Sequence, residues 1–478
     1  MSNESQSVPQ PPALAPLSTL EKWGLASALV VFALYQLHAA MNHGSWGQDF
    51  HAHLGWIKEA FEKPREFMTT YKEGRTNPPL YHYLCAKVMS LVSKKWDANT
   101  VNLGLPLLAI FSAVLHVLGL LALYQVLRRI IHSAVLRLAC MLLLLFSPFA
   151  MIHSLVVASD ALLTPLFFFA LYQFVLLAEP QPRNRFVRIV LGLSFVLLLC
   201  IATKFTAMSM VPAAAIVLAA LWRTGILSRG RLAMAAVMIV LIPGCFAFWA
   251  FSDYKSQQSY TLGIKKYGTR DPNGFNPRSL VLPRRADLHL IRNALSYDAK
   301  AEDGVSLDII IPNHYSYLGL VHVSMFTDMM NIYQYDPTDA YFGPRSDSHA
   351  RRMRRAVKPA LVFTLGAMLA LPALFLGSLI GVWRREKRAV NVFMLAILSL
   401  AFFMNIVVFL PFVPAYGGGY WLPRLVAPAL ISFFVLLFVG LDRLCVGRWR
   451  TAAWGCLFFV VIQSYLHLSF LWVDTPPA

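Results

Sequence analysis

The chain has 478 residues, of which 57% are hydrophobic and 14% are charged, and its mean hydropathy is +0.56. A soluble domain is typically about 45–50% apolar and about 25% charged, so this composition excludes an ordinary soluble protein. The net charge of +18 would favour a nucleic-acid partner in a soluble protein. Here the cations concentrate in loops between apolar segments, and we expect no nucleic-acid partner.

Apolar segments of about 17–25 residues, the length that crosses a bilayer as a helix, recur along the chain. Backbone groups in lipid need internal hydrogen bonds, so helices are the expected spanning form. We therefore predict an all-α polytopic membrane protein with about eleven transmembrane helices. The predicted spans are 23–41, 100–127, 137–153, 160–177, 187–202, 206–222, 232–252, 359–383, 389–411, 424–441 and 452–471.

These spans divide the chain into four parts. Residues 1–22 are polar and rich in proline, as expected of a disordered cytoplasmic tail. An N-terminal transmembrane module follows over 23–252, and it includes a first outer loop over 42–99. Residues 253–357 form a second large outer-face loop, or cap domain, before a C-terminal transmembrane module over 358–478. Within the first loop, 78–95 has a lysine midway, which favours an interfacial helix over a span.

The positive charges orient the chain in the membrane. Seventeen of the 42 Lys and Arg residues fall in the short segments on the side of the N-terminus, whereas the short joints on the other side hold only Lys204 and Arg424. Short cationic loops stay cytoplasmic, so we expect a cytoplasmic N-terminus. A cluster at 351–358 departs from this pattern. Either the long loop overrides it, or it binds anionic lipid head groups.

The first outer loop begins with the sequence MNHGSWGQDFHAHLGW. Asp49 and His53 are four residues apart and share a face if this segment is helical. At the bilayer surface a carboxylate can act as a general base. The alternative is that Asp49 only caps a helix. His53 is a candidate acceptor or metal ligand, although a single histidine is more often structural.

Two isolated charges mark the next outer joints. Asp160 is the only charged residue between Arg137 and Glu179, and Lys204 is the only one between Arg188 and Arg223. Charged groups near apolar runs indicate functional sites. The alternatives are a helix cap for Asp160 and a side chain that snorkels to the interface for Lys204.

The last outer joint, FVPAYGGGYWLPRLVAP, contains Arg424, whose guanidinium suits a phosphate. One carboxylate beside phosphate-binding cations is the set of groups that sugar transfer from a phospholipid carrier requires. The carboxylate accepts a proton from the acceptor, and the cations stabilise the departing phosphate.

The order of these pieces resembles the membrane-embedded GT-C glycosyltransferases of the protein O-mannosyltransferase and lipid A aminoarabinose transferase kind, a glycosyltransferase family 39-like group. The matching pieces are Asp49, the segment NPPLYHYL over 77–84, the joint at Asp160 and the TKFTA joint at Lys204, with a weaker match at PRLVAP. The resemblance implies a GT-C-type bundle with two large outer-face loops.

The resemblance also implies site roles. Asp49 becomes the base or a metal-site carboxylate, Asp160 its catalytic partner, and Lys204 the residue that holds the donor phosphate. Arg424 stays a candidate for the same phosphate because of its guanidinium. The donor is a polyprenyl-phosphate sugar of the dolichyl or undecaprenyl type. A divalent cation, Mg²⁺ or Mn²⁺, is a candidate cofactor. The chain departs from the family at Phe50, where an acidic residue often stands, and at Leu425, where a tyrosine often follows the arginine.

The loop over 253–357 matches no family segment. His314 and Tyr315 lie in an aromatic, polar stretch and are candidates for contact with a lipid, glycan or protein acceptor, with a folded aromatic cap as the alternative. The expected location is a bacterial inner membrane, with the site on its outer face and lipids around the helices. The competing interpretations are a transporter or flippase of lipid-linked or small solutes, a lipid-linked polymerase or ligase of another fold, and a catalytically inactive scaffold.

Overall fold

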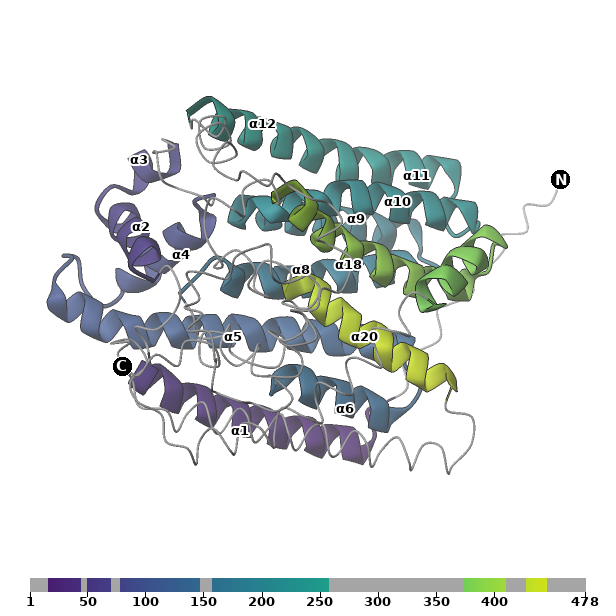
Figure 1. Ribbon diagram of the computed structural model, residues 1–478, viewed down its shortest axis with the longest axis horizontal. Helices are drawn as coiled ribbons and strands as arrows, with labels where there is room; N and C mark the ends of the chain where they lie inside the picture. Colours follow the sequence, from purple (N-terminus) through teal and green to yellow (C-terminus); the bar gives the residue numbers. More distant parts are fainter. Residues whose placement is uncertain are drawn as a thin grey trace, which may run out of the picture.

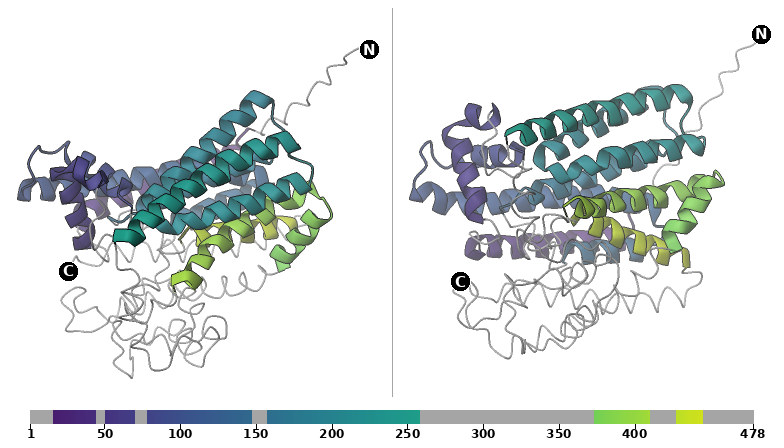
Figure 2. Two further views of the ribbon diagram at one scale, coloured as in Figure 1. Left: turned by 90° about the horizontal axis from the view of Figure 1, so that it is seen from above. Right: turned by 45° about the horizontal axis from the view of Figure 1, so that its top comes forward.

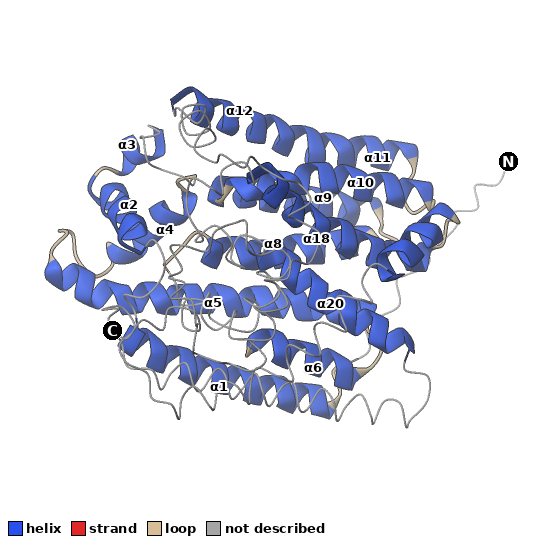
Figure 3. Ribbon diagram, in the orientation of Figure 1, coloured by secondary structure: helices blue, strands red, loops and turns tan. Residues whose placement is uncertain are grey.

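The structure is a computed structural model that describes residues 16–43, 50–69, 78–146, 157–257, 373–409 and 427–444. Throughout these residues the regular elements are helices, and no strand occurs among them (Figure 3). In lipid, the backbone of a long apolar segment can form hydrogen bonds only within the segment, which explains why these segments are helices. The predicted all-α polytopic membrane fold is confirmed.

Six helical stretches among the described residues are long and apolar enough to cross a bilayer. They coincide with predicted spans to within a few residues. Their elements are α1 (Thr19–His43), α5 (Ala98–Ile130), α8 (Asp160–Leu177), α9 (Arg183–Thr203), the pair η1 (Phe205–Ser209) and α10 (Met210–Arg223), and the series α11 (Arg229–Ala235), η2 (Ala236–Leu241) and α12 (Ile242–Gln257).

Further apolar helices cover parts of other predicted spans. They are α6 (Ala134–Leu145), the helix Ala373–Trp383, α18 (Val390–Phe409), which follows the short turn η5 (Lys387–Ala389), and α20 (Ala427–Leu444). The predicted span 452–471 lies outside the described residues, so the count of eleven stays a prediction. Figures 1 and 2 show most of these helices running side by side as one bundle.

Three short helices from the first outer loop gather at one end of the bundle (Figures 1 and 2). They are α2 (Phe50–Glu62), α3 (Pro64–Thr69) and α4 (Leu80–Met89). α4 is shorter than the predicted helix over 78–95. The Ser90 hydroxyl donates to the Lys87 carbonyl, a local bond that competes with further helix. At ten residues, α4 is too short to span a bilayer.

α5 and α8 approach one another closely in the core. A Cβ at Gly119 would lie 2.6 Å from the Cα of Pro165, closer than side chains tolerate. Gly119 therefore permits the contact, and the apolar faces of both helices belong to one large buried cluster. This packing sets the position along the bundle axis at which α8 begins.

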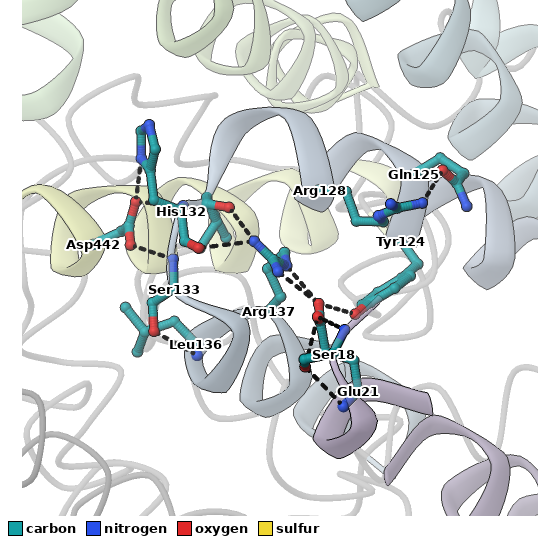
Figure 4. A network of polar contacts seen from close by, with 11 residues as sticks. Ser18, Glu21, Tyr124, Gln125, Arg128, His132, Ser133, Leu136, Arg137 and Asp442 are labelled. Carbon is teal, nitrogen blue, oxygen red and sulfur yellow. Dashed lines mark hydrogen bonds and ion pairs between the residues drawn. The ribbon is translucent and has the colours of Figure 1, made fainter. Parts of the chain in front are cut away.

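The opposite end of the bundle carries a polar network (Figure 4). The Glu21 carboxylate of α1 accepts hydrogen bonds from the Tyr124 hydroxyl of α5 at 2.5 Å and from the Arg137 guanidinium of α6 at 2.7 Å. Nearby, the Asp442 carboxylate of α20 accepts from the backbone N–H groups of His132 and Ser133. We call this the Glu21 end, and the end with α2, α3 and α4 the Asp160 end.

The cationic loops predicted to share one membrane face meet at the Glu21 end. Arg129 forms an ion pair with Glu179 at 2.9 Å, and the guanidinium groups of Arg223 and Arg231 lie over aromatic rings from neighbouring segments. This grouping is the one that the charge pattern predicts. That this face is cytoplasmic stays a prediction.

The last long helix of the N-terminal module contains a π-helical stretch. Residues Ala236–Leu241 form η2, which joins α11 to α12 without a loop. α12 continues through Gln257, past the expected start of the outer loop at 253.

Candidate active site

Asp160 lies where α8 begins. It is the first residue of the helix, where a negative charge is favoured by the unpaired N–H groups of the first turn. Ser159 precedes it and makes no side-chain capping bond. The side chain of Asp160 is only 5% exposed, and its Oδ1 atom is 2.6 Å from the ammonium of Lys204. The carboxylate therefore does more than cap its own helix.

Lys204 lies where α9 ends. Its backbone is extended, with φ −156° and ψ 133°, and it separates α9 from η1. This break turns the side chain back into the bundle, where it is 8% exposed and pairs with Asp160. The predicted alternative of a lysine that snorkels to the interface does not fit a buried ammonium. The two isolated charges of the sequence therefore form one buried ion pair.

Such a pair suits the recognition of a phosphate. An ammonium carries three N–H donors, so it can contact a carboxylate and a phosphate oxygen together. A buried ammonium without a carboxylate partner would be costly, which explains why Asp160 accompanies it. The carboxylate fixes the direction of the ammonium, and the ammonium supplies positive charge at a buried position.

His53 is also buried, and the sequence did not predict its contact with His82. Its Nδ1 is 2.8 Å from Nε2 of His82, a histidine of α4, and the two rings stack with centroids 5.1 Å apart. Trp56 packs edge-on against both rings. One nitrogen donates and the other accepts, so the contact depends on the tautomers. His82 lies inside the segment NPPLYHYL, and its pairing across two helices gives no local signal in the sequence.

The histidine pair does not by itself form a metal centre. Two nitrogens bound to one tetrahedral zinc ion at about 2.0–2.1 Å would lie about 3.3 Å apart, farther than the 2.8 Å seen here. Within the described residues, no group of three potential His, Cys, Asp or Glu ligands occurs. A complete ligand set at His53 would need residues outside the described part, such as Asp49.

A small apolar cluster joins the histidine pair to the Asp160 joint. Tyr81, Cys85 and Met89 recur along one face of α4, and each is completely buried. They pack with side chains from the start of α8 and from α2, α3 and α5: Val157, Ala161, Leu162, Ile57, Ala60, Phe67, Leu105 and Leu108. The NPPLYHYL segment is thus bound to the residues around Asp160.

The remaining predicted site residues lie outside the described residues. They are Asp49, Arg424, His314 and Tyr315, together with almost all of the loop over 253–357. Of the predicted residues that the structure describes, it brings Asp160 and Lys204 into contact. It places His53 in the same end of the molecule, in the helices that pack on the Asp160 joint.

Residues 76–249 match the family described as dolichyl-phosphate-mannose-protein mannosyltransferase. The match covers α4, the Asp160 joint and the Lys204 joint, in the order the motifs predict. The match covers 174 of the 478 residues, about a third of the chain, and over this part the chain is similar to that family. The resemblance seen in the motifs is thereby confirmed over these residues. No curated protein sequence matches it significantly.

Solved structures share the GT-C architecture. The oligosaccharyltransferase of Archaeoglobus fulgidus in the apo form has a TM-score of 0.52 at 14% identity, over 95% of this chain and 56% of that one. The Archaeoglobus fulgidus protein AglB, in complex with an inhibitory peptide and a dolichol-phosphate, has a TM-score of 0.51 at 14% identity, over 96% and 57%. ArnT from Cupriavidus metallidurans bound to undecaprenyl phosphate has a TM-score of 0.48 at 14% identity, over 92% and 62%.

At this identity the likeness concerns the fold alone. The chain spans little more than half the length of the archaeal structures it matches. The GT-C bundle is therefore the part held in common, and the activity of this chain has to be argued from its own residues.

Proposed function

We propose that the protein transfers a sugar from a polyprenyl-phosphate donor to an acceptor at the membrane face where its Asp160 end lies. The observation that carries the proposal is the buried pair between Asp160 and Lys204 at the joints that begin α8 and end α9. The match to a mannosyltransferase family over residues 76–249 supports it, as does a dolichol-phosphate in a protein of the same fold.

The donor phosphate is the expected ligand of Lys204. As the bond between the anomeric carbon and the phosphate oxygen breaks, the phosphate keeps the electron pair and its negative charge grows. An ammonium held in place by Asp160 stabilises this charge without having to reorient. Arg424 is proposed as a second cation for the same phosphate, because its guanidinium can donate hydrogen bonds to two phosphate oxygens at once.

Asp49 is proposed as the general base. It stands immediately before α2, the helix that carries His53. The acceptor hydroxyl or amine gives its proton to the carboxylate while the new bond to the anomeric carbon forms on the face opposite the departing phosphate, which inverts that carbon. Positive charge on the sugar ring in the transition state also favours a nearby carboxylate.

The loop over 253–357 is proposed to contact the acceptor through His314 and Tyr315. The site is proposed to face the outside of a bacterial inner membrane, with the Glu21 end in the cytoplasm. A transporter would be expected to place its ionisable pair near the middle of the bilayer. The pair here lies at helix ends, which favours an enzyme.

The test uses the purified chain in nanodiscs with a panel of polyprenyl-phosphate sugars, acceptor extract and divalent metals. The readout is released polyprenyl phosphate. We expect the wild type to release it and Asp49→Asn and Lys204→Met to lose at least about a hundredfold in rate, since each removes a charge that acts in the transition state.

Lys94→Met is the matched control, because Lys94 is an exposed lysine of the same end. Its rate should equal that of the wild type. Equal rates for wild type and Lys204→Met would remove Lys204 from the site. No release by the wild type with any donor would reject the proposed transfer.

A further inference from the structure

Tyr81 is a completely buried side chain with a polar group next to the Asp160 joint. It is 0% exposed and lies in the first turn of α4, directly after the two prolines that begin that helix. Its ring packs in the cluster that also contains Val157 and Ala161, on either side of Asp160. The ring alone would be explained by packing.

The hydroxyl of Tyr81 is not explained by packing. It lies near the Cys85 thiol one turn along α4, the Ser112 hydroxyl of α5 and the backbone of Ala158, two residues before Asp160. Neither the Tyr81 nor the Ser112 hydroxyl completes a hydrogen bond. Burial raises the pKa of Tyr81 well above its usual value, so the hydroxyl keeps its proton. A phenylalanine would fill the same space without burying this group, and a buried polar atom without a bond calls for a reason.

The backbone around Ala158 sets the position of Asp160. The Ala158 carbonyl accepts from the Ala161 N–H at 3.0 Å, and the Ser159 carbonyl accepts from the Leu163 N–H at 3.0 Å, so these residues form the first turn of α8. A group that holds the backbone of Ala158 therefore holds the origin of the helix. It also holds the carboxylate that pairs with Lys204.

We propose that Tyr81 is a positioning residue for the Asp160–Lys204 pair, acting through the backbone of Ala158 and the hydroxyl of Ser112. The hydrogen bonds that are incomplete here close when a donor phosphate engages Lys204, because such bonds often tighten only in the complex. This inference rests on the proposed function and names a part of the same site. It also assigns a structural role to the NPPLYHYL segment, which places Tyr81 beside the Asp160 joint.

The test compares Tyr81→Phe with Tyr83→Phe in nanodiscs. Tyr83 lies on the same helix, is partly exposed, and has Lys87 over its ring at 5.1 Å, away from the cluster. We expect Tyr81→Phe to lower kcat about tenfold with the KM for the donor unchanged, as for a small displacement of reacting groups. Its thermal midpoint should equal or exceed that of the wild type, and Ser112→Ala should lower kcat in the same direction.

Tyr83→Phe should match the wild type in both quantities. In an Asp160→Asn background, Tyr81→Phe should cause no further loss, since its effect passes through Asp160. The positioning role is wrong if Tyr81→Phe leaves kcat unchanged. It is also wrong if Tyr81→Phe lowers kcat by the same factor in the Asp160→Asn background as in the wild type.

A second measurement does not depend on activity. With saturating polyprenyl phosphate and no sugar donor, hydrogen exchange of peptides that contain Ala158–Leu163 should be faster in Tyr81→Phe than in the wild type or Tyr83→Phe. Without polyprenyl phosphate the three proteins should exchange alike, because the hydrogen bonds of Tyr81 are incomplete in that state. If the wild type transfers no sugar, the proposed function fails while this exchange comparison still decides whether Tyr81 holds the joint. Unchanged exchange in Tyr81→Phe in the presence of polyprenyl phosphate would overturn the inference.

Discussion

The two ends of the bundle use buried carboxylates in different ways. At the Glu21 end, the Glu21 carboxylate accepts hydrogen bonds from Tyr124 of α5, from Arg137 of α6 and from Ser18, which precedes α1 (Figure 4). At the Asp160 end, the carboxylate pairs with a lysine that stands in a break between two helices. The first arrangement joins helices, whereas the second presents a cation at a joint.

The number of charges therefore does not locate the site. The Glu21 end holds most of the short-loop cations, and the contacts found there connect one helix to the next. The Asp160 end also carries charged residues, and its surface pairs, such as Lys58 with Glu62, are exposed, whereas Asp160 and Lys204 meet inside the bundle. Three substitutions sharpen this contrast.

The largest effect is expected for Asp160→Asn. Asparagine keeps the shape of the side chain but removes the charge that fixes the Lys204 ammonium, so we expect about a hundredfold loss of transfer rate. The measurement is single-turnover release of polyprenyl phosphate by folded protein. Full activity combined with a large fall in thermal stability would show that this pair joins helices, as at the Glu21 end.

The next effect is expected for Glu21→Gln. The amide cannot accept all the hydrogen bonds that the carboxylate receives, and the Arg137 guanidinium would lose its carboxylate partner. We therefore expect the free energy of unfolding to fall by about 3–5 kcal/mol. The activity of each folded molecule should not change. Chemical denaturation in detergent, scored beside Lys22→Gln as an adjacent control, measures the difference. A loss of rate without a loss of stability would contradict the contrast between the ends.

The smallest effect is expected for Asp97→Ala. Asp97 caps α5 by accepting from the Thr100 N–H at 2.7 Å, and this bond lowers the pKa of its carboxyl. The cap thus stabilises the folded state above the ordinary carboxyl pKa, and the benefit is lost as the pH falls through the lowered value. The thermal midpoint of Asp97→Ala should fall slightly below the wild type near neutral pH and converge with it in acid. Asp97→Asn is the control, since its cap does not titrate.

Much of the fold follows from the sequence because apolar length and helix formation are local properties. The segments around 23–41 and 160–177 contain enough apolar residues to require helices, and the structure forms α1 and α8 there. The isolated charges Asp160 and Lys204 were identified for the same reason, since each stands out against its apolar neighbours.

What the sequence does not reveal is pairing at long range. No local sequence pattern indicates that Asp160 contacts Lys204 rather than a ligand, that His53 stacks on His82, or that Tyr81 faces Ala158. These contacts depend on how α2 and α4 pack on α5 and α8. The end of α4 at Met89 was also not predicted, because the bond from Ser90 to the Lys87 carbonyl outweighs the helical pattern that continues beyond it.

The π-helical stretch Ala236–Leu241 has a consequence for comparing this chain with others. A π-helical turn accommodates one residue more than an α-helical turn, so it records an insertion within a continuous helix. A homologue without that residue would align through the stretch with a single gap. With the gap placed inside the stretch, its counterpart of α12 presents the same face. With the gap placed after α12, each residue of α12 would be matched to one about 100° away around the helix, the angle of one residue. Residue-by-residue transfer of roles onto Ile242–Gln257 therefore requires that the gap be placed first.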